Sequence, residues 1–168
     1  KSYLPSGTMA TFQYANGIPI IRIKATFPRQ QVILDQMNST TGWAAAGTAS
    51  ALTQDSAVYY QAPASLRFNL GVGTGTLTKT ITQTDLSSYQ DVGVSFLATR
   101  IPDGADASDI TGISLKLGSD SGNYDLVTET EGFLGAWVAG EWLLVAFDFA
   151  GSTSTGSPNW SVIDYVQI

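Results

Sequence analysis

The fold class that the sequence predicts is all-β. From Gln31 onward the chain contains short segments in which apolar and polar residues alternate, as in strands with one buried face. Gly, Asp, Asn, Ser and Pro separate these segments, and no stretch keeps a helical period. Eight strands with connections of uneven length fit two packed antiparallel sheets. We therefore expect a two-sheet, jelly-roll β-sandwich.

The individual strands follow from period-two alternation, which places residues i and i+2 on the same face. This rule predicts three inward faces, which are Leu66, Phe68 and Leu70; Val92, Val94, Phe96 and Ala98; and Ile113, Leu115 and Leu117. Residues 142–149 are apolar on both faces until Asp148, which predicts a central position in a sheet. The eight expected strands are Val32–Met37, Ser65–Leu70, Gly75–Thr82, Val92–Arg100, Gly112–Leu117, Tyr124–Glu131, Trp142–Phe149 and Val162–Ile168.

The beginning of the chain differs from the rest in charge. The first 34 residues contain Lys1, Arg22, Lys24 and Arg29 and no acid, which leaves −10 for the remainder because the whole chain carries −6. Within this segment the β-branched run 18–27 predicts a strand. We expect residues 1–30 to be a connector or edge-strand segment, linked to an upstream domain or paired at the sandwich edge, and residues 31–168 to form the sandwich.

Composition excludes several classes of function. The chain has no Cys and no His, which excludes Ser-His-Asp and Cys-His catalysis and metal sites built on these ligands. The net charge of −6 and the pI of about 4.3 oppose binding to nucleic acid. No apolar run approaches the roughly 20 residues that span a bilayer, so no membrane insertion is expected. Charged residues make up only 13% of the chain, which favours an extracellular or virion protein.

Aromatic residues in polar loops are the first candidates for ligand contact, because flat rings stack on the C–H faces of sugars. Trp43, Tyr60, Tyr124 and Trp160 lie among residues too small or polar to bury them fully. Arg67 is a candidate polar partner, since its guanidinium offers a fixed fork of donors to sugar hydroxyls. The alternative is that these aromatics close the ends of the sandwich. Trp142 begins an apolar strand and is expected in the core.

Carboxylates offer two weaker signals. Asp35, Asn38, Asp55 and Asp164 could contribute oxygen ligands to Ca²⁺, although their spacing matches no EF-hand loop, and residues 120–123 predict a hairpin turn. Glu129 and Glu131, at i and i+2, could serve as the carboxylate pair of a glycosidase. Alternating Thr and Glu is also typical of a solvated strand face, and we expect no catalytic residue here.

From Val32 to Ile168 the order of features resembles the jelly-roll carbohydrate-binding modules, including those on bacteriophage tail fibres and tailspikes. The features are Val32-Ile33-Leu34-Asp35, Gly42-Trp43, Pro63-Ala64-Ser65-Leu66-Arg67-Phe68, Asp85-Leu86-Ser87-Ser88-Tyr89, Ile113 to Asp120 with Asn123-Tyr124, and Gly156-Ser157-Pro158-Asn159-Trp160 before Ile163 to Ile168. The resemblance implies a structural Ca²⁺ between the first and last strands, held by Asp35 and Asp164. Residues 132–140 depart from the family pattern, which puts binding residues near that loop in doubt.

These observations lead to three hypotheses. The first is a non-catalytic module that binds a polysaccharide or cell-surface glycan within a larger extracellular or virion protein. The second is a structural virion domain that assembles with other subunits or an upstream domain, favoured by the edge strand expected at residues 18–27. The third, a glycoside hydrolase or lyase, rests on Glu129 and Glu131 alone.

Overall fold

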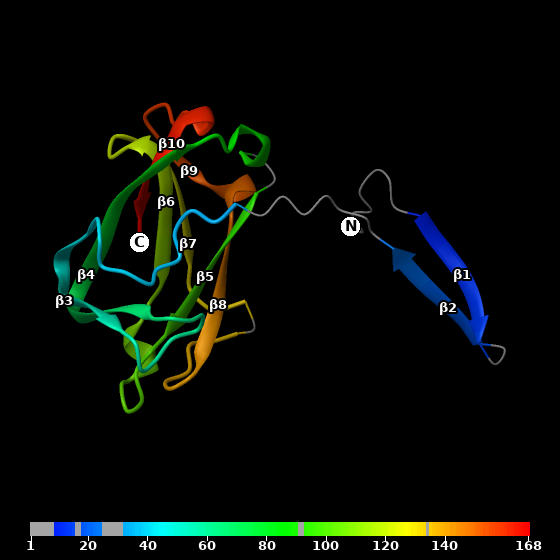
Figure 1. Cartoon of the computed structure of the whole chain (residues 1–168), viewed down its shortest axis with the longest axis horizontal. Helices are drawn as coiled ribbons and strands as arrows, with labels where there is room; N and C mark the ends of the chain where they lie inside the picture. Colours follow the sequence, from blue (N-terminus) through cyan, green and yellow to red (C-terminus); the bar gives the residue numbers. More distant parts are fainter. Residues whose placement is uncertain (1–8, 16–17, 25–31, 91–92, 134) are drawn as a thin grey trace. The chain divides into compact units, whose positions relative to one another are not determined.

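The chain divides into two compact units, Lys1–Ile33 and Leu34–Ile168 (Figure 1). The structure is a computed structural model that describes residues 9–15, 18–24, 32–90, 93–133 and 135–168. In the first unit, β1 (Met9–Ala15) and β2 (Ile18–Lys24) form an antiparallel hairpin. The strand expected over residues 18–27 is thus present up to Lys24, and residues 25–27 lie outside the described part of the chain.

The second unit contains a six-stranded antiparallel sheet with the strand order β3-β4-β10-β6-β7-β9. The hairpin turn expected at residues 120–123 is present, and the Asp120 carboxylate accepts the Gly122 N–H at 2.7 Å. The six strands are β3 (Trp43–Asp55), β4 (Ser65–Thr84), β6 (Ile113–Asp120), β7 (Asn123–Glu129), β9 (Thr153–Thr155) and β10 (Ile163–Gln167).

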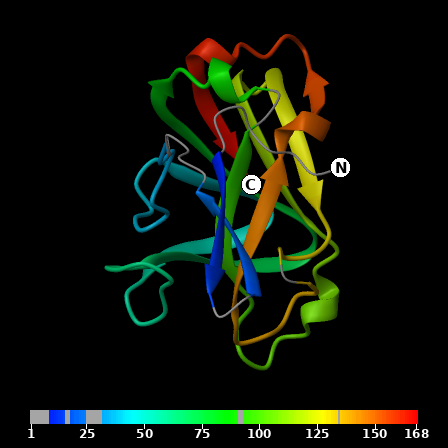
Figure 2. The ribbon, with the colours of Figure 1, turned by 90° about the vertical axis from the view of Figure 1, so that its right-hand side faces the viewer.

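A second sheet consists of β5 (Val94–Arg100) and β8 (Trp142–Asp148), which run antiparallel side by side (Figure 2). The helical segments of the described residues are four 3-10 turns of three residues each, Ser87–Tyr89, Ala107–Asp109, Phe149–Gly151 and Trp160–Val162. None of the described helices has the length and hydropathy of a membrane-spanning segment. The all-β prediction is confirmed, with a β-sandwich-like architecture.

The hydrophobic core lies between the two sheets. Val145 and Phe147 of β8 have no exposed surface, and they belong to one cluster with buried residues of the larger sheet. Complete burial of one such side chain contributes about 1.5–3 kcal/mol to folding. The residues that the larger sheet contributes to this core are Trp43, Ala49, Leu77, Ile81, Leu115, Leu117, Val127, Ile163 and Val166.

Two parts of the large sheet differ from the expected strands. Residues 32–37 form no strand, because the Asp35 carboxylate accepts the Met37 N–H at 2.7 Å and the chain turns there. The stretches around Leu70 and Gly75 belong to one strand, β4, whose residues between Ser65 and Lys79 pair with β3. Strand β3 was not expected, since its Ala, Gly, Ser and Thr residues have no alternating pattern and its pairing with β4 defines it.

The face of β5 that packs against the core is the opposite of the predicted one. Val94 is 46% and Phe96 57% exposed, whereas Leu97 packs against the core. The cause is β8, whose Val145 and Phe147 are fully buried and pair with Leu97 and Ser95 of β5. Because β8 fixes the inner face, the more apolar face of β5 points outward. Val92, expected on the same face, lies outside the described residues.

Candidate functional site

The outer face of the six-stranded sheet carries two rows of side chains that cross five strands. Leu77, Leu117, Val127 and Val166 point into the core, so their chain neighbours point outward. The register gives the first row as Thr80, Tyr165, Gly118, Tyr124 and Thr155. The second row consists of Thr78, Gln167, Lys116, Leu126 and Thr153. We call these two rows the tyrosine platform.

A glycine separates the two tyrosines of the platform. Gly118 of β6 pairs with Tyr165 of β10 on one side and with Tyr124 of β7 on the other. A Cβ atom at Gly118 would meet the Asn123 carbonyl oxygen and the Tyr124 backbone, with the Tyr124 Cα only 2.7 Å away. The packing of the hairpin therefore requires glycine here. As a result, no side chain stands between the two phenol groups.

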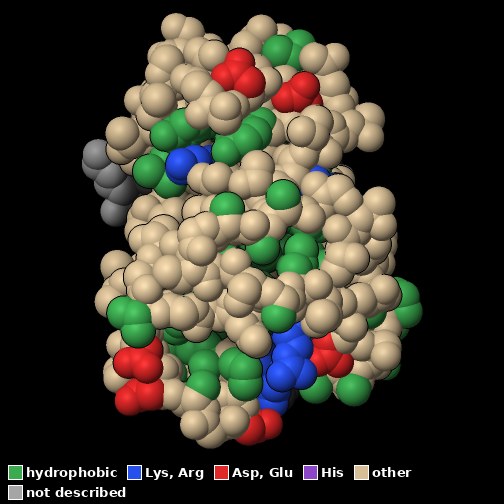
Figure 3. All heavy atoms as spheres, turned by 90° about the vertical axis from the view of Figure 1, so that its left-hand side faces the viewer, with side chains coloured by type: hydrophobic (Ala, Val, Ile, Leu, Met, Phe, Trp, Pro, Cys, Tyr) green, Lys and Arg blue, Asp and Glu red, His purple; other side chains and the backbone are tan. Residues whose placement is uncertain are grey.

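Polar groups surround the tyrosines. Gln167 Nε2 donates a hydrogen bond to Thr78 Oγ1 at 2.9 Å, and the Tyr165 side chain also bonds with Thr78. The Lys116 ammonium lies over the Tyr124 ring, 4.5 Å from its centroid, which is a cation–π contact. Figure 3 shows one side of the molecule with side chains coloured by type, and a basic side chain in the upper part of this view lies among hydrophobic side chains.

The two phenols have different acidities. The hydrogen bond with Thr155 and the positive charge of Lys116 lower the pKa of Tyr124 below the ordinary value of tyrosine. Burial raises the pKa of Tyr165, and its hydrogen bond with Thr78 only partly offsets this effect. The surroundings therefore favour ionisation of Tyr124 and disfavour that of Tyr165. A phenol hydroxyl can both donate and accept a hydrogen bond, so each tyrosine offers a polar group to a ligand.

A second surface, on the outer side of β5 and β8, is apolar. Val94, Phe96 and Leu144 are 46%, 57% and 36% exposed. Trp142 lies on the same strand face as Leu144, and its ring is 5.8 Å from that of Tyr60. We call Val94, Phe96, Leu144, Trp142 and Tyr60 the apolar strip. Trp142 is thus half-buried beside an exposed tyrosine, whereas the sequence placed it in the core.

The expectation that Trp43 and Trp160 are displayed is wrong. Trp43 is 7% and Trp160 3% exposed, and both belong to the core. Asp125, a buried carboxylate, accepts the Trp160 indole N–H and the Ser154 hydroxyl. Asp35 accepts the Trp43 indole N–H at 3.4 Å. Each indole therefore has a carboxylate as partner within the fold, and neither ring face is available as a platform.

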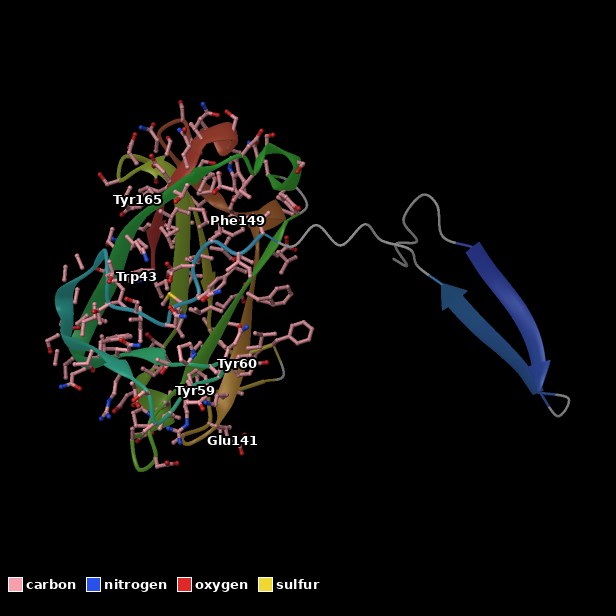
Figure 4. All side chains as sticks on the ribbon, viewed as in Figure 1. Trp43, Tyr59, Tyr60, Glu141, Phe149 and Tyr165 are labelled. Carbon is pink, nitrogen blue, oxygen red and sulfur yellow. The ribbon has the colours of Figure 1, made fainter. Side chains whose placement is uncertain are left out.

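The other predicted ligand residues are separated in the structure. Tyr124 lies on the tyrosine platform. Tyr60 is 63% exposed in the loop between β3 and β4, and the Arg67 side chain, 61% exposed on β4, is 3.7 Å from Asp55. Figure 4 shows Tyr165 in the upper part of the sandwich and Tyr60 in the lower part. The structure therefore does not assemble the five predicted residues into one site.

The metal ligands predicted from the resemblance have other surroundings. Lys79 Nζ lies 2.5 Å from Asp35 Oδ2, and the other Asp35 oxygen accepts the Met37 N–H. Asp164 lies at a register shift between Ile163 and Tyr165 of β10. Within the described ranges, no three His, Cys, Asp or Glu side chains lie together as a metal site. The Lys79 ammonium thus supplies the positive charge that neutralises Asp35.

The candidate catalytic pair does not share a strand face. Strand β7 ends at Glu129, and the chain bends at Thr130, so that Glu131 lies beyond the strand. The geometry assumed for a glycosidase pair, two carboxylates projecting from one strand, is therefore not present at these positions.

The sequence reasoning searched the loops for aromatics and found only Tyr124 of the platform. Lys116, Tyr165 and Gln167 lie within strands, on the polar side of the alternating segments Ile113 to Leu117 and Ile163 to Gln167. The alternation itself was a usable signal, because it separates outward residues from core residues. Which outward residues become neighbours depends on the strand order, which alternation does not reveal.

Comparisons with known proteins add no assignment: no protein-family model matches the chain, and no curated protein matches its sequence.

Proposed function

We propose that this chain is a non-catalytic glycan-binding module of a larger extracellular or virion protein, such as a phage tail, and that the glycan lies on the tyrosine platform. The observation that carries the proposal is the pair Tyr165 and Tyr124 on either side of Gly118 on an outward sheet face. The proposal includes a jelly-roll topology for the sandwich. The proposal does not include calcium, because the carboxylate of Asp35 forms an ion pair with the Lys79 ammonium.

The chemistry of the platform suits a sugar. Phenol rings offer apolar faces for the C–H surface of a pyranose, and their hydroxyls meet its polar edge. Gln167 and Lys116, in the adjacent row, add donors for ring hydroxyls. Because Gly118 has no side chain, the platform has room between its two tyrosines for successive residues of an extended glycan. The proposed mode is therefore contact with the side of a polysaccharide chain.

The proposal contains no catalytic step. Glycoside hydrolysis uses two carboxylates flanking the bond that is cleaved. The two rows of the platform contain Tyr, Lys, Gln, Thr, Leu and Gly, and no acid. The side chains of the platform can bind and orient a sugar, and the function assigned to them is binding alone.

The test is a glycan-array screen of the chain, followed by calorimetric titration of the best oligosaccharide with variants Tyr165→Ala and Tyr124→Ala. Loss of a stacking residue should weaken binding by about 1–3 kcal/mol while changing the melting temperature little. Tyr59→Ala is the matched control, since Tyr59 is exposed and lies outside the platform. Absence of binding to any glycan, or equal affinity of all three variants and the native chain, would contradict the proposal.

The apolar strip favours a second candidate function, assembly with another protein. Exposed apolar groups on one sheet face are typical of protein contacts. In this case Phe96, which is 57% exposed, should be required for association. Size-exclusion chromatography with light scattering would show a concentration-dependent oligomer that Phe96→Ser converts to a monomer. A monomer at all concentrations would argue against self-assembly through the strip.

A further inference from the structure

We infer that the glycan held by the tyrosine platform is anionic and that Lys116 binds its charged group. The inference rests on the proposed function and specifies its ligand. The anionic group is a sugar carboxylate or a sulfate ester, both of which present oxygens to an ammonium group.

The first argument is the balance of charge. The second unit contains all 14 carboxylates of the chain and four basic residues. Three of the four are paired with acids: Lys79 with Asp35 at 2.5 Å, Arg100 with Asp103 at 2.9 Å, and Arg67 with Asp55 at 3.7 Å. Lys116 is the fourth, and no carboxylate of the described residues lies within 4.0 Å of its ammonium. In an acidic unit, the one basic group without an acid partner is available to an external anion.

The second argument is the neutral surroundings of Lys116. Its neighbours across the sheet are Gln167 and Leu126, and the other platform positions are Thr, Tyr and Gly. The contacts that the ammonium makes within the platform are with the neutral side chain of Tyr124. The long-range field of the acidic unit is weakened by salt, since the Debye length is about 8 Å at physiological ionic strength. The two rows of the platform therefore carry one positive charge and no carboxylate.

The third argument is the position of the ammonium. Lys116 Nζ lies over the ring of Tyr124, 4.5 Å from the centroid, instead of extending into solvent. This contact holds the ammonium of Lys116, a residue of the second row, against the first row, which contains both tyrosines and Gly118. The Tyr124 side chain also forms hydrogen bonds with Lys116 and with Thr155. An anionic group bound at the platform would accept from the Lys116 ammonium.

The experiment compares three oligosaccharides of the same length and linkage: a neutral one, one with uronic acid residues and one with sulfate esters. Calorimetric titration should give about 10- to 100-fold tighter binding of at least one anionic ligand, the range for charge-assisted hydrogen bonds. Preference for the uronate identifies a carboxylate ligand, and preference for the sulfate ester identifies a sulfated one. Either preference should decrease with increasing NaCl.

Variants of Lys116 make the result specific. Lys116→Gln should abolish the preference for the anionic ligand, and Lys116→Arg, which keeps the charge, should retain most of it. Arg67→Gln is the control that removes the same charge from an exposed residue outside the platform, and it should preserve the preference. Thermal melting confirms that each variant is folded.

The possible failures are distinguishable. If the neutral oligosaccharide binds as tightly as both anionic ones, or if Arg67→Gln removes the preference as fully as Lys116→Gln does, the inference is overturned while the proposed function stands. If none of the three ligands and no glycan of the array binds, the proposed function itself fails.

Discussion

The buried side chain of Asp125 explains why the indole of Trp160 can lie in the core. It is 3% exposed, and its oxygens accept the Trp160 indole N–H and the Ser154 hydroxyl. These bonds connect β7 to β9 and to the 3-10 turn that begins at Trp160. A buried carboxylate is tolerated only when its hydrogen bonds are made. The pair therefore stabilises the end of the sandwich where Trp160 packs against Phe149.

We predict that Asp125→Ala lowers the free energy of unfolding by about 2–4 kcal/mol, because it leaves the buried Trp160 indole N–H without an acceptor and removes the hydrogen bond with Ser154. Chemical denaturation measures this loss. Asp103→Ala is the control: the Asp103 side chain is 81% exposed, and its ion pair with Arg100 should be worth less than about 1 kcal/mol. Equal effects of the two substitutions would show that Asp125 has no special structural role.

Four aspartates at turns have a pKa below the usual 3.8, and they share a short-range cause. In each case hydrogen bonds from residues two or three positions later stabilise the charged form. The hydrogen bond that lowers the pKa most comes from the Val58 N–H for Asp55, the Ser87 side chain for Asp85, the Ser108 side chain for Asp106 and the Asn123 side chain for Asp120. These hydrogen bonds are therefore stronger when the carboxylates are ionised.

The consequence is acid sensitivity. A folded-state pKa below the unfolded value contributes stability that is complete above about pH 4 and is lost as the pH falls through the folded pKa. The melting temperature should therefore decrease below about pH 4. In Asp120→Asn, the contribution of the Asp120 charge is absent, so the native chain and the variant should differ most at neutral pH and converge in acid. Melting curves between about pH 2 and 7 measure this, and parallel curves throughout the range would contradict it.

At the scale of the element, the sequence predicted strands wherever alternation reflects burial. Strands β6, β7, β8 and β10 lie close to their expected positions, and the alternation is clearest in β6, where Leu115 and Leu117 point inward. The pattern could not predict β3, which is rich in Ala, Ser and Thr, or the face of β5. Both depend on partners distant in sequence, β4 for pairing and β8 for the choice of face. The same limit explains why only Tyr124 of the platform was predicted.

Gly118 is the residue on which the β6–β7 hairpin and the platform both depend. We predict that Gly118→Ala lowers the free energy of unfolding by about 1–3 kcal/mol, because the added methyl group overlaps the backbone of Asn123 and Tyr124. Thermal melting measures the effect. Gly151→Ala is the control, since a Cβ there meets no atom within 4 Å. If both variants melt like the native chain, the close packing at Gly118 is not a constraint on the fold.

For the whole molecule, the sandwich unit presents two different outer faces. The six-stranded sheet has a polar face with tyrosines, and the β5–β8 sheet has an apolar one. The sequence predicted two packed sheets and a glycan-binding function from loop aromatics. The structure puts two of those aromatics, Trp43 and Trp160, in the core and offers sheet faces instead. A glycan on one face leaves the other available for a different partner.

The last prediction concerns the independence of the sandwich. Its buried hydrophobic residues extend from Trp43 to Val166, so they all belong to the unit Leu34–Ile168. A domain with its own core can fold alone. Residues 34–168, produced without the first 33, should therefore unfold cooperatively with a melting temperature within about 3 °C of the full chain, equivalent to less than about 1 kcal/mol. Residues 1–33 produced separately are the complementary sample, and they should show no cooperative transition because an isolated two-stranded hairpin is marginally stable in water. Circular dichroism and calorimetry measure both fragments. A shortened chain that melts without cooperativity, or more than about 10 °C lower, would show that the first unit is required for the fold of the second.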